Sequence, residues 1–231
     1  GAVCVENDEE IVLFDTCTFN DNSAVRGGGL YAISANVVNC SFISNEASRG
    51  GGGLRLQTGR VENCTFSENS SGTNGGGLLS IDAEIDQCTF QTSLAEKKGG
   101  GLSFQISNIS NSDFRNNEAV ESGGGIYSSA QGFDNQVAGC TFSENSANSG
   151  GGGSLEGCTI KQCIIQENSA TEGGGLFCDS SLVENSLFYS NHATDGGAIS
   201  SETLLTIQNC TVVDNDVSDQ GGAIYFQYPT N

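Results

Sequence analysis

Several residue types are scarce in this chain, and each scarcity excludes a class of protein. Methionine and tryptophan are absent, and there is one proline among 231 residues. The 33 glycines would suit a flexible linker, but 36% of the residues are hydrophobic, which is enough apolar surface for a packed core. No apolar run approaches the ~20 residues of a membrane-spanning helix, so we expect no direct membrane insertion by this segment. The missing methionine indicates a piece of a longer chain.

Positive charge is also scarce. Eight Lys and Arg residues face 28 Asp and Glu residues, which gives a net charge of −20. Such a surface repels phosphate backbones and anionic lipid head groups, so we expect no nucleic-acid partner.

What the sequence has in abundance is a repeat. The unit begins Cys-Thr-Phe, reaches an Asn five residues after its start and closes with Gly-Gly-Gly-Leu. A further apolar residue stands three positions before each start. The steps between copies are 23 to 28 residues, and the nine imperfect copies start at Cys17, Cys40, Cys64, Cys88, Ser112, Cys140, Cys163, Ser186 and Cys210.

Each unit offers three short apolar patches that are separated by corners rich in Asn, Gly and Ser. No patch is long enough for a helix, and no period of 3.6 residues is present. The repeat therefore predicts an all-β fold, a right-handed parallel β-helix of about nine rungs with three short strands per rung. Stacked rungs would form one domain over residues 1–231, a rod ~40 Å long.

Seven of the ten cysteines fall in one inward column, where Ser112 and Ser186 take the two remaining places. Because the slot accepts Ser and neighbouring side chains project in parallel, we expect a stack of buried free thiols without metal. Cys158 and Cys178 lie outside this column, on successive rungs at similar offsets. They form the one disulfide that we hypothesise.

Other candidate sites lie on the surface. The only sizeable insertion follows Ile126 and contains Phe133, a candidate partner contact. Stacked acidic corners bring Glu144 and Glu167 to adjacent rungs, where they could share Ca²⁺, although a solvated face is the simpler interpretation. Five Asn-x-Ser/Thr sequons are candidate N-glycosylation sites in a secreting eukaryote: Asn39, Asn63, Asn69, Asn108 and Asn209.

Two motifs of the repeat carry a family resemblance. Gly-Gly-Ala-Ile occurs at 196–199 and 221–224, and Phe-x-x-Asn occurs at 19–22, 42–45, 66–69, 114–117, 142–145 and 188–191. The combination resembles the repeats of chlamydial polymorphic outer membrane proteins, and similar repeats occur in large surface proteins of algae and other protists. The resemblance implies a β-helical adhesin passenger and supplies no catalytic residue.

Two classes of function follow. We expect a non-enzymatic extracellular or cell-surface segment: a rigid spacer, filament component or adhesin passenger with protein or glycan partners, or one that self-associates end to end. The alternative is a polysaccharide-binding or polysaccharide-cleaving β-helix enzyme, which needs clustered carboxylates. No adjacent Asp-Asp pair occurs, and the single His192 follows the Asn column as a corner residue. We therefore predict no catalytic residue, cofactor or metal site.

Overall fold

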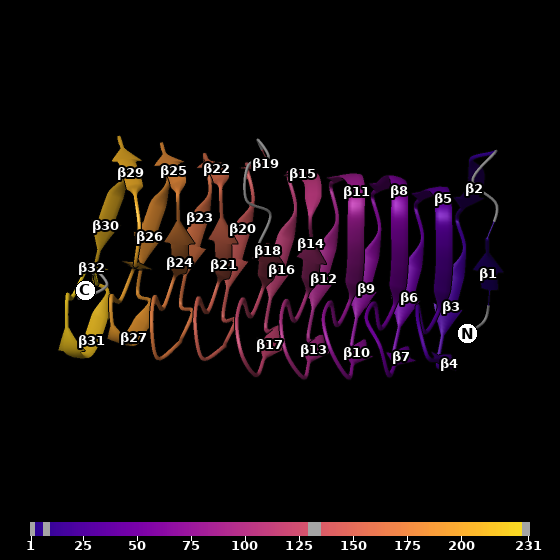
Figure 1. Ribbon diagram of the computed structural model, residues 1–231, viewed down its shortest axis with the longest axis horizontal. Helices are drawn as coiled ribbons and strands as arrows, with labels where there is room; N and C mark the ends of the chain where they lie inside the picture. The colour runs from indigo at the N-terminus through magenta and orange to yellow at the C-terminus, as the bar shows by residue number, and fades with distance from the viewer. Residues whose placement is uncertain (1–2, 7–9, 129–134, 228–231) are drawn as a thin grey trace.

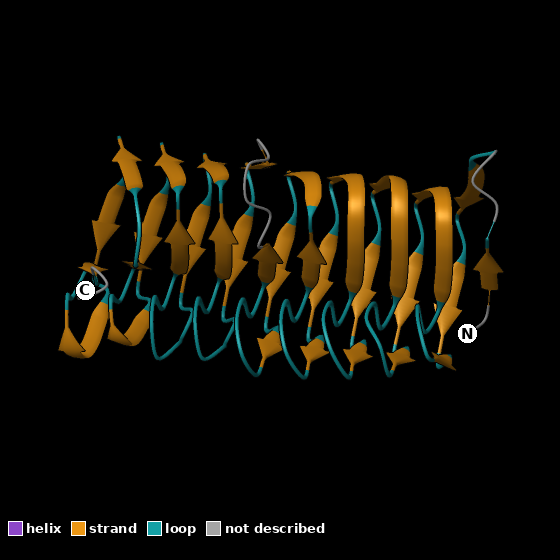
Figure 2. Ribbon diagram, in the orientation of Figure 1, coloured by secondary structure: helices purple, strands orange, loops and turns teal. Residues whose placement is uncertain are grey.

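The computed structural model describes residues 3–6, 10–128 and 135–227. The chain winds into a rod of nine rungs, with β1 at one end and β32 at the other (Figures 1 and 2). Each strand pairs in parallel with its counterparts one rung away, which confirms the predicted parallel β-helix. Within the described residues, no helix could span a membrane.

The Cys-Thr-Phe segments form the most regular layer, which we call the Phe sheet. Each rung contributes one strand of three residues whose middle side chain points into the core, because alternate side chains of a strand face opposite sides. The nine strands are β3 (Thr18–Asn20), β6 (Ser41–Ile43), β9 (Thr65–Ser67), β12 (Thr89–Gln91), β16 (Asp113–Arg115), β20 (Thr141–Ser143), β23 (Ile164–Gln166), β26 (Leu187–Tyr189) and β30 (Thr211–Val213).

The other two apolar patches of each repeat form a 16-stranded layer, which we call the long sheet. In the early rungs both patches join in one nine-residue strand: β5 (Leu30–Val38), β8 (Leu54–Glu62) and β11 (Leu78–Asp86). Elsewhere the patches are separate strands, as the sequence predicts: β1 (Val3–Val5), β2 (Val12–Asp15), β14 (Leu102–Phe104), β15 (Ile106–Ser110), β18 (Ile126–Ser128), β19 (Asn135–Ala138), β21 (Gly153–Glu156), β22 (Cys158–Lys161), β24 (Leu176–Asp179), β25 (Ser181–Glu184), β28 (Ile199–Ser201), β29 (Leu205–Gln208) and β32 (Ile224–Phe226).

Backbone conformation explains two of these breaks. Gly157 separates β21 from β22 with a φ of 65°, and Ser180 separates β24 from β25 with a φ of 49°. A residue in the left-handed region cannot continue an extended strand, so the chain bends there. Short strands line the opposite corner of the rung: β4 (Ser23–Ala24), β7 (Glu46–Ala47), β10 (Ser70–Ser71), β13 (Leu94–Ala95), β17 (Glu118–Ala119), β27 (His192–Asp195) and β31 (Asp216–Gln220).

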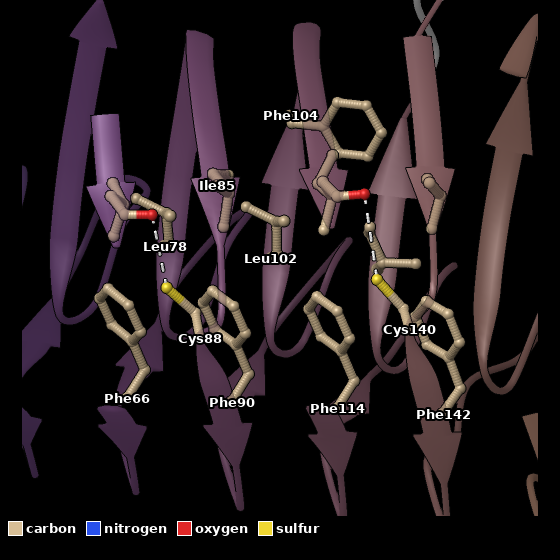
Figure 3. Close-up of a cluster of buried hydrophobic side chains, with 14 of the residues drawn as sticks. Phe66, Leu78, Ile85, Cys88, Phe90, Leu102, Phe104, Phe114, Cys140 and Phe142 are labelled. Carbon is tan, nitrogen blue, oxygen red and sulfur yellow. Dashed lines mark hydrogen bonds between the residues drawn. The ribbon is translucent and has the colours of Figure 1, made fainter. Parts of the chain in front are cut away.

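The core is a set of stacked columns rather than a central cluster. Six phenylalanines from Phe19 to Phe142 stack with ring centroids 4.7–4.9 Å apart and interplanar angles of 2–8°. Figure 3 shows the part of this stack from Phe66 to Phe142. The rings are nearly parallel at the spacing of the rungs, which lies within the range of favourable aromatic stacking. Ile165, Phe188 and Val212 continue the column.

One core column has no side chain in the sixth rung. The aliphatic residue that follows the glycines elsewhere is replaced by Gly153, which pairs with Ile126 and Leu176. A Cβ built on Gly153 would lie 2.7 Å from Cγ2 of Ile126 and 3.2 Å from Cδ2 of Leu176. The neighbouring side chains therefore fill the space that a side chain at Gly153 would need.

The Gly-Gly-Gly corner is required by close approach of the backbones. Gly75 has a φ of 66°, and a Cβ on the next residue, Gly76, would lie 2.3 Å from the carbonyl oxygen of Gly100. Only glycine allows rungs to stack this tightly at the corner.

Left-handed corners also flank each strand of the Phe sheet. Their residues have φ values near 50°, except for Gly139 at 64°. The corner before the strand uses Thr16, Asn39, Asn63, Gln87, Asn111, Gly139, Gln162, Asn185 and Asn209, and the corner after it uses Asp21, Ser44, Glu68, Thr92, Asn116, Glu144, Glu167, Ser190 and Asp214.

Candidate functional site

The predicted thiol column is a hydrogen-bonded ladder. The Sγ of Cys64 accepts the main-chain N–H of Cys40 at 3.4 Å and donates to the carbonyl of Glu62 at 3.2 Å. Where Ser occupies the slot the pattern persists: Ser112 Oγ accepts from Cys88 N and donates to the Ser110 carbonyl. Figure 3 shows the Cys88 and Cys140 sulfurs directed at carbonyls of the facing long sheet. The slot selects a small group that both donates and accepts.

Burial makes three of the thiols, Cys40, Cys158 and Cys178, poorly reactive. Burial raises the pKa of Cys40 to about 11 and that of Cys158 to about 12. It also raises the pKa of Cys178 well above the ordinary value. Since the thiolate is the nucleophile and the metal ligand, these side chains are inert at neutral pH.

The recurring Asn forms a second ladder inside the Phe-sheet corner. Asn45 donates from its main-chain N and from Nδ2 to Oδ1 of Asn69, both at 3.0 Å. Its Nδ2 also donates to the carbonyl of Phe19. Within the described residues the ladder is interrupted where Ser93 replaces Asn, because the Ser93 hydroxyl donates to its own strand at Gln91. The Asn column is therefore structural.

The proposed disulfide partners lie in different columns. Cys158 aligns with Asn135, whereas Cys178 aligns with Leu155, so their offsets within the rung differ. Both are free, buried thiols, and Cys158 donates to the carbonyl of Glu156. The similar offset expected from the repeat is wrong because the bend at Gly157 lies between the two columns.

The sequons separate into exposed and buried positions. Asn39, Asn63 and Asn209 are exposed in the left-handed corner before the Cys, and Asn108 is exposed on the long sheet. Asn69 is 0% exposed. Its Nδ2 donates to the Phe42 carbonyl inside the Asn ladder. Asn69 is therefore excluded as a glycan acceptor in the folded chain, which corrects that prediction.

The acidic corner residues are explained by their position. Glu144 and Glu167 are exposed at the left-handed corner after the Phe-sheet strand, with φ values of 56° and 55°. In the part of the chain that the structure describes, no group of three or more His, Cys, Asp or Glu side chains could hold a metal ion.

Two further predictions concern surface residues. His192 is a corner residue with a 58% exposed side chain, and its Nδ1 lies 3.3 Å from Oδ2 of Asp216. Phe133, the candidate partner contact, lies outside the described residues.

Sequence reasoning missed one surface feature, which we call the outer column. It is the outward-facing column of the long sheet that follows the glycine corner. Large apolar residues alternate in it with Cys, Arg or Ser on successive rungs. Its members among the described residues are Cys4, Tyr31, Arg55, Leu79, Ser103, Tyr127, Ser154, Phe177, Ser200 and Tyr225. In the sequence, this alternation recurs in every second copy of the repeat. The repeat itself is recognised from residues that recur in every copy, so the alternation is easily overlooked.

Comparison with known families agrees with this architecture. Residues 1–142 match the family described as a right-handed β-helix region, and the chain belongs to that family, which confirms the predicted handedness. Residues 185–202 match the Chlamydia polymorphic membrane protein repeat. That stretch contains Phe188, Asn191 and the Gly-Gly-Ala-Ile of 196–199, so the predicted family resemblance is confirmed. None of the curated proteins compared matches the chain significantly.

Proposed function

We propose that this chain is a rigid, non-enzymatic segment of an extracellular or cell-surface protein, which holds other parts of that protein or its partners at a distance. The observation that carries the proposal is the stack of nine rungs in the described part of the chain, in which Phe, thiol and Asn columns run along one axis. A solenoid with a continuous core behaves as a rod because every rung is fixed to both neighbours.

The repeat of residues 185–202 supports the surface location, since the family model that it matches is described as a repeat of Chlamydia polymorphic membrane proteins. The net charge of −20 supports a solvated exterior. Partners at such a surface would be proteins, glycans or further copies of the chain.

Antibody labelling of the source cells tests the location. We expect intact, unpermeabilised cells to be labelled; labelling that requires permeabilisation would contradict the proposal. The absence of catalysis is tested by incubating the chain with neutral and acidic polysaccharides. New reducing ends or unsaturated sugars would establish the alternative, a polysaccharide-cleaving β-helix enzyme.

A further inference from the structure

The second half of the outer column lines a trough. Tyr127 and Phe177 are both half-buried, lie two rungs apart and have Ser154 between them. The trough encloses about 310 Å³, and its wall on the glycine-corner side contains Ser122, Ser149 and Glu172. Most of the lining residues are polar, and two aromatic side chains, Tyr127 and Phe177, stand among them. A concave strip that combines aromatic side chains with convergent polar groups suits a polar ligand with apolar faces.

One ring of the trough is held in place. Lys98 Nζ lies 4.7 Å from the ring centroid of Tyr127 and donates to its hydroxyl at 3.0 Å. These contacts limit the rotation of the ring, which reduces the entropy lost when a ligand packs against it.

The other end of the trough is acidic. Glu156, Glu172, Asp179 and Glu202 line it, against the single cation of Lys98. Burial raises the pKa of Glu172, and the nearby carboxylates of Glu202 and Asp195 raise it further. An anionic ligand would meet this charge, whereas an ammonium group would relieve the repulsion between the carboxylates.

The spacing of the rings defines the shape of the ligand. Successive rungs are 4.7–4.9 Å apart at the stacked Phe rings, so alternate rungs are separated by roughly 9.6 Å. In a β-1,4-linked glycan every second sugar presents the same face, and this disaccharide repeat is about two rungs long. The C–H groups on a pyranose face pack well against the electron-rich face of an aromatic ring.

We infer that the trough between Tyr127 and Phe177 binds an extended β-1,4-linked glycan that carries amino rather than acidic groups. The glycan runs along the rod axis, with sugar faces on alternate rungs. Its hydroxyl and ammonium groups donate to the carboxylates, which can only accept. A polyproline II peptide has a similar repeat of about 9.3 Å per turn, but its free polar groups are mainly carbonyl acceptors, which the four carboxylates of the trough would repel.

The experiment is calorimetric titration of the intact chain at physiological salt with a hexamer of β-1,4-linked glucosamine. Hexamers of β-1,4-linked glucose and mannuronic acid test the role of charge, and hexalysine tests non-specific attraction to the acidic rod. Phe177→Ser and Tyr127→Ser remove the rings by introducing the residue that the column already contains at Ser154. Tyr189→Ser, on the Phe sheet, is the matched control.

We expect the glucosamine hexamer to bind most tightly, the glucose hexamer more weakly and the mannuronate hexamer not at all. Each ring variant should weaken the binding at least tenfold, and the control should leave it unchanged. Leu79→Tyr, which extends the alternation by one aromatic ring, should strengthen the binding of longer oligomers. A thermal unfolding transition like that of the unsubstituted chain verifies that each variant folds.

Three results would overturn the inference. The first is no glycan binding, and the second is glycan binding that is unaffected by the loss of either ring. The third is binding of hexalysine or of a proline-rich peptide that is as tight as that of the glucosamine hexamer and depends on the rings in the same way. The inference goes beyond the spacer function, since a spacer needs no ligand. It fails independently of that function, because surface labelling is unaffected by the ring variants.

Discussion

The thiol slot shows how one side-chain position is selected by two bonds at once. The group there must accept an N–H from the preceding rung and donate to a carbonyl two residues before it, and both Cys and Ser do so. The polarity of Ser is no disadvantage in this buried position because both of its hydrogen bonds are satisfied.

Substitutions at Cys64 separate the effect of hydrogen bonding on stability from the effect of side-chain volume. Cys64→Ser keeps both bonds and should change the free energy of unfolding by less than about 1 kcal/mol. Cys64→Ala leaves the Cys40 N–H without its acceptor and creates a small cavity, which together should cost about 2 kcal/mol. Urea unfolding under reducing conditions measures both. Equal losses in the two variants would show that the bonds contribute nothing.

The interrupted Asn ladder predicts a stabilising substitution. Ser93→Asn would accept the main-chain N–H of Asn69 and donate to the Phe66 carbonyl, as the repeat places these groups in the other rungs. The free energy of unfolding should rise by about 1–2 kcal/mol. Thermal and urea unfolding should agree, and Ser93→Ala serves as control. A less stable Ser93→Asn variant would mean that the slot is too small for an amide.

The raised pKa values of the buried thiols predict that the folded chain loses stability at alkaline pH. In the folded chain the pKa values of Cys40 and Cys158 are raised to about 11 and about 12 from an ordinary value of 9.0. The unfolded chain therefore loses these protons at a lower pH than the folded chain. The contribution of the two thiols to the free energy of unfolding is complete below pH 9 and is lost as the pH rises towards 12. Urea midpoints should fall through this range. The fall should be smaller in the Cys40→Ser, Cys158→Ser double variant, and an equal fall would contradict the prediction.

At the scale of the element, the glycine corner limits how closely rungs can approach. Gly76→Ala forces a Cβ against the Gly100 carbonyl and should destabilise the chain by about 3 kcal/mol or more. Gly222→Ala is the matched control, because it occupies the same place in the last rung and a Cβ there meets nothing within 4 Å. Melting temperatures of the two variants test the difference, and equal shifts would show that side-chain size at the corner is unimportant.

Much of the element structure could be predicted from the repeat. The inward Phe column and the glycine corners follow from columns that recur every 23 to 28 residues. The joining of two patches in β5, β8 and β11 could not be predicted, because it depends on whether one intervening residue adopts a left-handed conformation, as Gly157 and Ser180 do elsewhere. The trough was missed because outward positions tolerate most residues, and its alternation becomes visible only when the register is known.

At the scale of the whole molecule, the exterior determines what can be attached to the rod. If the source organism glycosylates this chain, peptide mapping of the native protein should find glycans on some of Asn39, Asn63, Asn108 and Asn209, which are exposed. Asn69 should be unmodified because its amide is buried in the ladder. Glycan on Asn69 would mean that modification precedes folding and that the Asn ladder is broken in the native protein.

The near identity of the columns has a consequence for how the chain reaches its native state. If one part of the solenoid formed displaced by a whole rung, Phe would still meet Phe and Asn would still meet Asn, so the misaligned state would retain most of the native contact energy. The two alignments are distinguished by the positions that depart from the repeat, among them Ser93 in the Asn column, Gly153 between Ile126 and Leu176, and the serines of the thiol slot. These local departures from the repeat specify the register of the rungs, because they make the displaced pairings less stable than the correct one.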